Sequence, residues 1–202
     1  GKTNRKPQPP FTTESMLRAA NGRMGWTIGR TNRVATALYQ SGHITYIRTD
    51  STRTSKSARD RIRSLIEKEY GSNHLGSGVL GPDAKKGASN VQDAHEAIRP
   101  TQPEVKTLTD VDADQQSLYR LIWGRFAASQ MSDSIRERRE LVVKSQNLEL
   151  PLYGTSSWRI HAGWEVVYSA DKEVKTEPPQ VGFTIGTIWG FTSTEENPLL
   201  TS

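Results

Sequence analysis

The spacing of apolar residues changes once along this 202-residue chain, and the change limits the folds that it can adopt. Up to about Arg139, apolar residues recur at intervals of three and four, which is typical of amphipathic helices. Beyond that point the pattern favours strands at Glu140–Ser145, Trp158–His161, Glu165–Ser169 and Val181–Trp189. The sequence therefore predicts an α+β fold, with a helical domain over residues 1–138 and antiparallel β strands of an incomplete second domain over 139–202.

The first part of the chain carries the signals of several helices. Thr13 starts the first helix, which Gly25 ends, and Thr31 starts a second that ends before Gly42. Because a short Gly-containing turn joins them, the pair predicts a helix-turn-helix. The other elements expected are a strand at His43–Thr49, which would make the layout winged-helix-like, and helices at Ser57–Tyr70, Asp93–Ile98 and from Asp112 or Asp114 to about Met131.

Composition excludes several classes of protein. No apolar run approaches the roughly 20 residues that a membrane helix needs, so we expect no membrane span, and we expect no secretory signal. The chain has no cysteine, which excludes disulfides and a thiolate nucleophile. Its four histidines are scattered singly, so a zinc site is not expected.

The charge is distributed unevenly along the chain. Residues 1–63 carry 13 Lys and Arg against three Asp and Glu, a net of +10, whereas residues 64–202 carry 14 against 19, a net of −5. No carboxylate lies between Glu14 and Asp50, but five arginines do. A stretch of one sign attracts a polyanion such as nucleic acid, although a solvated basic face would have the same composition.

A dense polar cluster follows the start of the expected strand at His43–Thr49. In an extended segment, residues two apart share a face, so Tyr46, Arg48 and Asp50 would point the same way. A guanidinium can hold a phosphate oxygen, and its positive charge favours the ionised form of a neighbouring phenol. The pair is therefore a candidate nucleophile and phosphate ligand. The alternative is a tyrosine at a strand edge, followed by a turn rich in hydroxyls.

A second polar cluster runs from Gln92 to Thr101. On a helix, His95 and Arg99 would be four residues apart and share a face, so they could donate to one phosphate backbone. The alternative is that both are ordinary surface residues.

Together the two clusters resemble the signatures of a known family. The stretch Ile44–Arg53 (ITYIRTDSTR) resembles the active-site tyrosine motif of the type IA DNA topoisomerases, and Ala94–Thr101 (AHEAIRPT) resembles that family's second signature. The order and separation of the two motifs also fit. The resemblance extends over nearly the whole chain, since the helices before the tyrosine and the later return to strands match the family's tyrosine domain and its β-rich arch.

The resemblance implies roles for individual residues. Tyr46 would attack a phosphodiester of single-stranded DNA, which leaves a 5′-phosphotyrosine link, and Arg48 would stabilise the charged phosphate. His95 would position the DNA backbone, Arg99 would contact a phosphate, and Asp50 would orient Arg48 or the tyrosine loop. The complete set of expected DNA-binding residues is His95, Arg99, Asp50, Thr49 and Arg53.

The resemblance also implies what else the reaction uses. The family's catalytic centre includes Mg²⁺ held by a Toprim domain, which has no counterpart in this sequence, so this chain should not cleave DNA efficiently alone. The acids Asp110, Asp112 and Asp114 are expected to cap a helix rather than to bind metal. The chain has no G-x-x-x-x-G-K-[ST] loop, and the reaction needs no ATP. The implied partners are single-stranded DNA and the remaining domains of the parent chain, in the cytoplasm at the nucleoid.

Two alternative hypotheses place the chain in a different functional class from a topoisomerase that relaxes negative supercoils. In the first, the chain is a winged-helix regulator that binds duplex DNA without catalysis, and Arg30 and Arg33 would contribute to its sequence preference. In the second, it is a structural interaction module with an incidental basic face.

Overall fold

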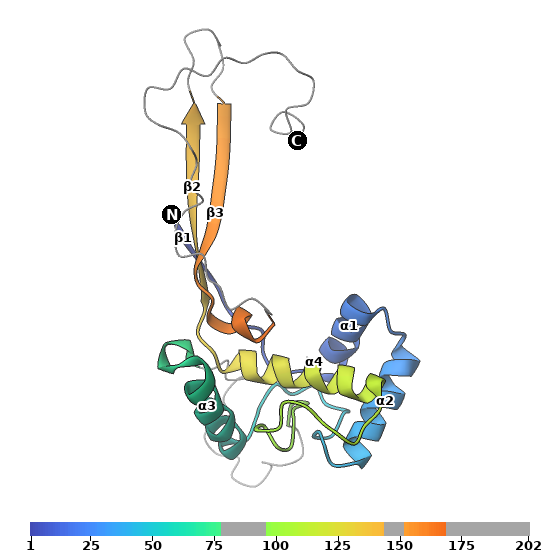
Figure 1. The fold of residues 1–202 in the computed structure, drawn as a ribbon. Helices are drawn as coiled ribbons and strands as arrows, with labels where there is room; N and C mark the ends of the chain where they lie inside the picture. Colours follow the sequence, from blue (N-terminus) through green and yellow to red (C-terminus); the bar gives the residue numbers. More distant parts are fainter. Residues whose placement is uncertain (78–95, 144–151, 169–202) are drawn as a thin grey trace.

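The computed structural model describes residues 1–77, 96–143 and 152–168, and in it a long β ribbon projects from a helical body (Figure 1). Its elements are, in chain order, β1 (Lys2–Arg5), α1 (Thr13–Met24), α2 (Ile28–Gln40), α3 (Lys56–Tyr70), η1 (Ser72–His74), α4 (Ala113–Ser129), β2 (Ser134–Val143), β3 (Leu152–His161) and η2 (Gly163–Val167). In the described ranges, helices α1 to α4 come between β1 and the antiparallel strands β2 and β3, so the predicted α+β class is confirmed. None of these helices has the length and hydropathy needed to cross a membrane.

The expected helix-turn-helix is present as α1 and α2. The Thr12 side chain accepts a hydrogen bond from Ser15 N, and the Ser15 hydroxyl accepts one from Thr12 N, which together cap the start of α1. Gly25 ends α1 with φ 68°, a conformation that favours glycine. Since Thr27 caps α2, this helix begins at Ile28 and not at Thr31 as expected.

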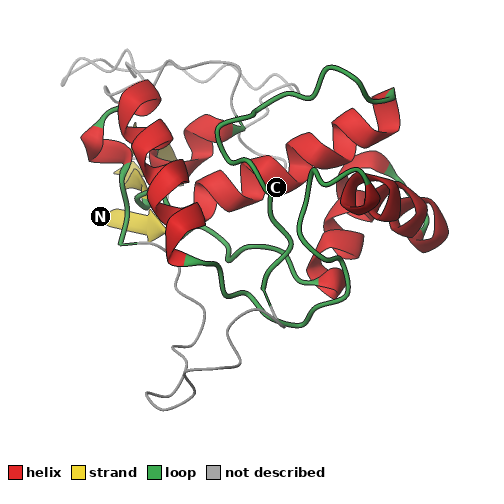
Figure 2. Ribbon diagram, turned by 90° about the horizontal axis from the view of Figure 1, so that it is seen from below, coloured by secondary structure: helices red, strands yellow, loops and turns green. Residues whose placement is uncertain are grey.

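Helix α4 forms the centre of the helical body, with α1, α2 and α3 packed around it (Figure 2). Its side chains Leu118, Ile122 and Phe126 are fully buried. The expected cap is confirmed, because Asp112 accepts a hydrogen bond from Gln115 N at 2.8 Å. The helical body thus has a core of its own.

The sheet has the order β1–β2–β3 and is antiparallel throughout. Strand β1 was not expected, and it pairs with the start of β2, with Lys2 opposite Glu137. Strands β2 and β3 are both longer than the sequence pattern predicts. The strand expected at Glu165–Ser169 is wrong over its described part, because residues 163–167 form the 3₁₀ helix η2. The strand expected at Val181–Trp189 lies outside the described residues. The division of the chain at residue 138 remains a prediction.

The ribbon meets the helical body at a compact junction. Ser132 N donates to His74 O at 2.8 Å, and the Ser132 hydroxyl lies 3.0 Å from Nε2 of His161. Burial and the neighbouring His161 lower the pKa of His74, so its neutral form is favoured there. Gly163 has φ 49°, and a Cβ at this position would lie 2.2 Å from Asp133 O. Only glycine fits this point of the junction.

Candidate active site

The segment that carries the tyrosine is an anchored loop, and the strand expected at His43–Thr49 is wrong. Only Ile44 forms a β bridge, with Pro100. The segment beside it contains Pro100, which has no N–H to donate to a ladder, so a regular strand pair does not form. Two buried side chains hold the loop on the core instead, Ile44 at 1% and Ile47 at 8% exposure.

The exposed side chains of this loop are the three that the motif singles out. Tyr46 is 50% exposed, and Arg48 and Asp50 are also exposed, whereas the residues between them are buried or half-buried. The loop therefore keeps the alternation of an extended segment without a partner strand. This places the phenol in solvent, accessible to a macromolecular substrate.

The surroundings of the six tyrosines set Tyr46 apart. Burial raises the pKa of Tyr70 and Tyr168, and burial with the charge of Glu104 raises that of Tyr119 to about 12, so these phenols resist ionisation. The exposed tyrosines are Tyr39, Tyr46 and Tyr153. Among these three, only Tyr46 has an arginine two residues further along the chain, on the same exposed side of its loop.

A pocket of about 600 Å³ opens beside the tyrosine loop, at the N-terminal end of α1. It is lined by Thr12, Thr13, Glu14, Arg48, Thr49 and Asp50. Within the described ranges, the guanidinium of Arg48 makes no hydrogen bond or ion pair, and neither does that of Arg53. Both groups are therefore available to a phosphate, for which a guanidinium is well suited.

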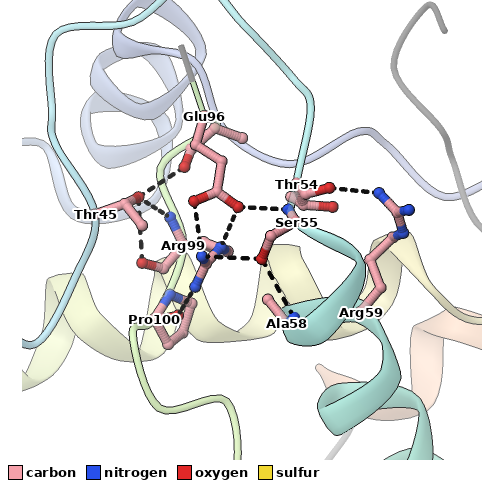
Figure 3. A network of polar contacts seen from close by, with 9 residues as sticks. Thr45, Thr54, Ser55, Ala58, Arg59, Glu96, Arg99 and Pro100 are labelled. Atoms are coloured by element: carbon pink, nitrogen blue, oxygen red, sulfur yellow. Dashed lines mark hydrogen bonds and ion pairs between the residues drawn. The ribbon is translucent and has the colours of Figure 1, made fainter. Parts of the chain in front are cut away.

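Behind the loop, a polar network joins three segments of the chain (Figure 3). The Arg99 guanidinium, only 11% exposed, binds both carboxylate oxygens of Glu96, at 2.9 and 2.7 Å. The same carboxylate accepts from Ser55 N, and Arg99 also donates to Pro100 O at 2.8 Å. Thr45 completes the network, since its hydroxyl donates to Ala97 O at 2.7 Å and accepts from Arg99 N at 3.0 Å.

The structure describes only part of the second signature, residues 96–101. Residues 96–98 are not helical, so the helix expected at Asp93–Ile98 is wrong over its described part, and Ile98 instead forms a bridge with Phe11. His95 lies outside the described residues. Arg99 uses its guanidinium inside the protein, and its contact with DNA remains a prediction, as do those of Thr49, Asp50 and Arg53.

Sequence reasoning missed two residues at this site. Thr13 was identified only as a helix start, but its hydroxyl reaches the tyrosine loop and donates to Ile47 O at 2.6 Å. Glu96 had no assigned role, although a glutamate three residues before the arginine of the motif is a signal for an ion pair.

Asp112 and Asp114 form hydrogen bonds within the helical body. Asp112 caps α4, and Asp114 accepts from Arg30 Nε at 2.9 Å and Nη2 at 2.8 Å. This hydrogen bonding lowers the pKa of Asp114. No group of three or more His, Asp or Glu side chains in the described ranges is arranged to hold a metal ion. The acids present there do not fit a magnesium site.

The sequence of the chain is similar to those of known proteins. The DNA topoisomerase family pattern matches residues 1–196. The chain is 35% identical over 191 residues to DNA topoisomerase 1 of Thermotoga maritima, covering 89% of this chain and 30% of that protein. It is 38% identical over 154 residues to DNA topoisomerase 1 of Escherichia coli K12, covering 75% of this chain and 18% of that protein.

The fold agrees with the sequence comparison. The structure of full-length topoisomerase I from Thermotoga maritima matches with a TM-score of 0.68 and 31% sequence identity, covering 85% of this chain and 29% of that chain. The chain thus spans less than a third of the length of these relatives. The match over nearly all of its own residues shows that it belongs to the bacterial type IA DNA topoisomerase family.

Proposed function

We propose that this chain is the tyrosine-bearing part of a topoisomerase that cuts one DNA strand through Tyr46. The phenolic oxygen gives up its proton and attacks the phosphorus of a phosphodiester, and a new oxygen–phosphorus bond forms. The bond from phosphorus to the 3′ oxygen breaks, and that oxygen leaves as a 3′-hydroxyl after taking up a proton. The observation that carries this proposal is the exposed Tyr46 beside Arg48, whose guanidinium has no partner within the described ranges.

Arg48 acts on the charge that develops during this step. Negative charge grows on the phosphate oxygens as the phosphorus gains a fifth ligand, and a guanidinium aimed at them lowers the barrier. Asp50 orients Arg48 or the loop, and Thr49 and Arg53 contact the backbone of the strand. By family resemblance His95 positions the strand and Arg99 contributes a phosphate contact.

The remaining parts of the cycle need more than this chain. The reverse attack by the 3′-hydroxyl reseals the strand without ATP, because the ester to Tyr46 conserves the bond energy. Passage of DNA through the opened strand relaxes negative supercoils. The family uses Mg²⁺, and we place its ligands in the Toprim domain of the parent protein, with the enzyme acting in the cytoplasm at the nucleoid. We assign residues 1–138 to the tyrosine domain and 139–202 to the arch, and the isolated chain should be inactive.

The ion pair of Arg30 argues against the regulator hypothesis. A winged-helix regulator would use the exposed residues of its helix pair to read bases. Arg30 is instead bound to Asp114 through two hydrogen bonds, and Asp114 also interacts with the charge of Arg33. A guanidinium held by a carboxylate is less available to a base edge.

The polarity of a trapped complex tests the proposal. The complete topoisomerase that contains this chain is incubated with magnesium and a single-stranded oligonucleotide labelled at one end, and the reaction is stopped with detergent. We expect the 3′-end label to stay with the protein and the 5′-end label to be released on a fragment with a free 3′-hydroxyl. Retention of the 5′-end label, or no covalent complex at all, would contradict the proposal.

A further inference from the structure

We infer that Thr13 is a positioning residue for strand cleavage, one that fixes the tyrosine loop on the first turn of α1. This inference rests on the function proposed above. Thr13 lies 33 residues before Tyr46 in the sequence but contacts the loop on both sides of Arg48. By these contacts Thr13 determines where Arg48 and Tyr46 are presented to the DNA strand.

The Thr13 side chain connects α1 to the loop both as a hydrogen-bond donor and as an acceptor. The Thr13 hydroxyl donates to Ile47 O at 2.6 Å and accepts from Thr49 N at 2.9 Å. The backbone N–H of Thr13 donates to Thr49 O, also at 2.9 Å. These bonds bracket Arg48, so the peptide units on either side of this arginine are tied to one residue.

Apart from the buried side chains of Ile44 and Ile47, the loop has few other anchors. Over the described ranges, every hydrogen bond to the backbone of residues 46–50 comes from Thr13. The next anchor on the N-terminal side is the bond from Thr45 N to Arg99 O at 2.9 Å. A loop without a β ladder depends on such individual bonds for its geometry.

The other side of the connection is a capped helix that packs on the core. Thr13 is the first residue of α1, directly after the mutual capping bonds of Thr12 and Ser15. Met16 and Ala20 of the same helix are fully buried. Thr13 therefore fixes the position of the tyrosine loop relative to the core of the helical body. Catalytic groups held by regular elements are placed more accurately than groups that rely on a loop alone.

The expected effect follows from the sensitivity of catalysis to placement. A shift of the reacting groups by about 1 Å can lower a rate by about 10²-fold. The Thr13→Val variant keeps the volume of the side chain and loses the hydrogen bonds of the hydroxyl to Ile47 and Thr49, but the buried Ile47 still anchors the loop. We therefore expect the cleavage rate to fall by about tenfold or more, whereas Thr13→Ser, which keeps the hydroxyl, should stay within about threefold of the wild type.

The test measures single-turnover cleavage at a saturating concentration of a single-stranded oligonucleotide, in the complete topoisomerase. Affinity for the same oligonucleotide and the fraction of folded protein are measured in parallel. Thr31→Val is the matched control, since this buried threonine also loses a hydroxyl bond, to Thr27 O at 3.1 Å, but in α2. We expect Thr13→Val alone to lower the rate per folded molecule, with the affinity nearly unchanged and the rate restored in Thr13→Ser.

The outcomes separate this inference from the proposed function. If Thr13→Val cleaves at the wild-type rate, or loses no more rate than Thr31→Val, the positioning role is overturned. The same holds if Thr13→Ser is as slow as Thr13→Val. If the Tyr46→Phe enzyme still forms the covalent complex, the proposed function fails instead, whatever Thr13 does.

Discussion

Replacing Tyr46 with phenylalanine is expected to abolish the covalent complex between the complete enzyme and single-stranded DNA. The substitution removes one oxygen, which is the atom proposed to bond to phosphorus. The ring itself remains and can keep its edge contact with Tyr39, whose centroid lies 5.3 Å away, so folding and DNA binding should persist. Loss of a nucleophile lowers turnover by several orders of magnitude, and we expect a fall of at least about 10³-fold.

The neighbouring tyrosine provides the control. Tyr39 is 42% exposed, and Tyr39→Phe removes a hydroxyl close to the same site. Detergent-trapped complex and binding of the labelled strand are measured for both variants. We expect Tyr39→Phe to retain the covalent complex and Tyr46→Phe to bind the strand without it. A Tyr46→Phe enzyme that still traps DNA would rule out the proposed nucleophile.

The second large effect concerns stability. Arg99→Met should lower the free energy of unfolding of the chain by about 2–3 kcal/mol, because it leaves the Glu96 carboxylate without its main partner. Breaking a fully buried ion pair costs about 3–5 kcal/mol, and Glu96 at 24% side-chain exposure recovers some of this through hydration. Equilibrium unfolding in urea measures the change.

An exposed ion pair of α3 is the comparison. Lys56 Nζ lies 2.6 Å from Asp60 Oδ2, and the two side chains are 82% and 55% exposed. We expect Lys56→Met to cost less than about 0.5 kcal/mol, as is usual for exposed pairs. Equal losses in the two variants would show that the network around Arg99 adds no particular stability.

The parts of the fold that the sequence predicts are those governed by local signals. Thr13, Gly25 and Asp112 mark helix ends within a residue of their observed places, because capping depends on neighbours along the chain. That Tyr46, Arg48 and Asp50 share the exposed side of the tyrosine loop was also predictable, because residues two apart in an extended segment point the same way. The functional motif was recognisable because its residues are contiguous in the sequence.

The parts that the sequence does not predict depend on distant partners. Strand β1 is a short segment with two charged residues, and it pairs with β2, which lies far away in the sequence. The segment after Gly42 alternates like a strand, but Pro100 limits pairing on the side where a partner lies. The role of Thr13 requires knowing that the start of α1 lies against the tyrosine loop, which no local pattern reveals.

Mapping the attachment site of DNA is the most direct measurement of the central claim. The trapped complex of the complete enzyme is digested with nuclease and protease, and the peptide that carries residual nucleotide is sequenced by mass spectrometry. We expect a single adduct, on the phenolic oxygen of Tyr46 in the peptide that contains Arg48 or ends at it. An adduct on Tyr39, on Tyr153 or on any residue outside this chain would contradict it.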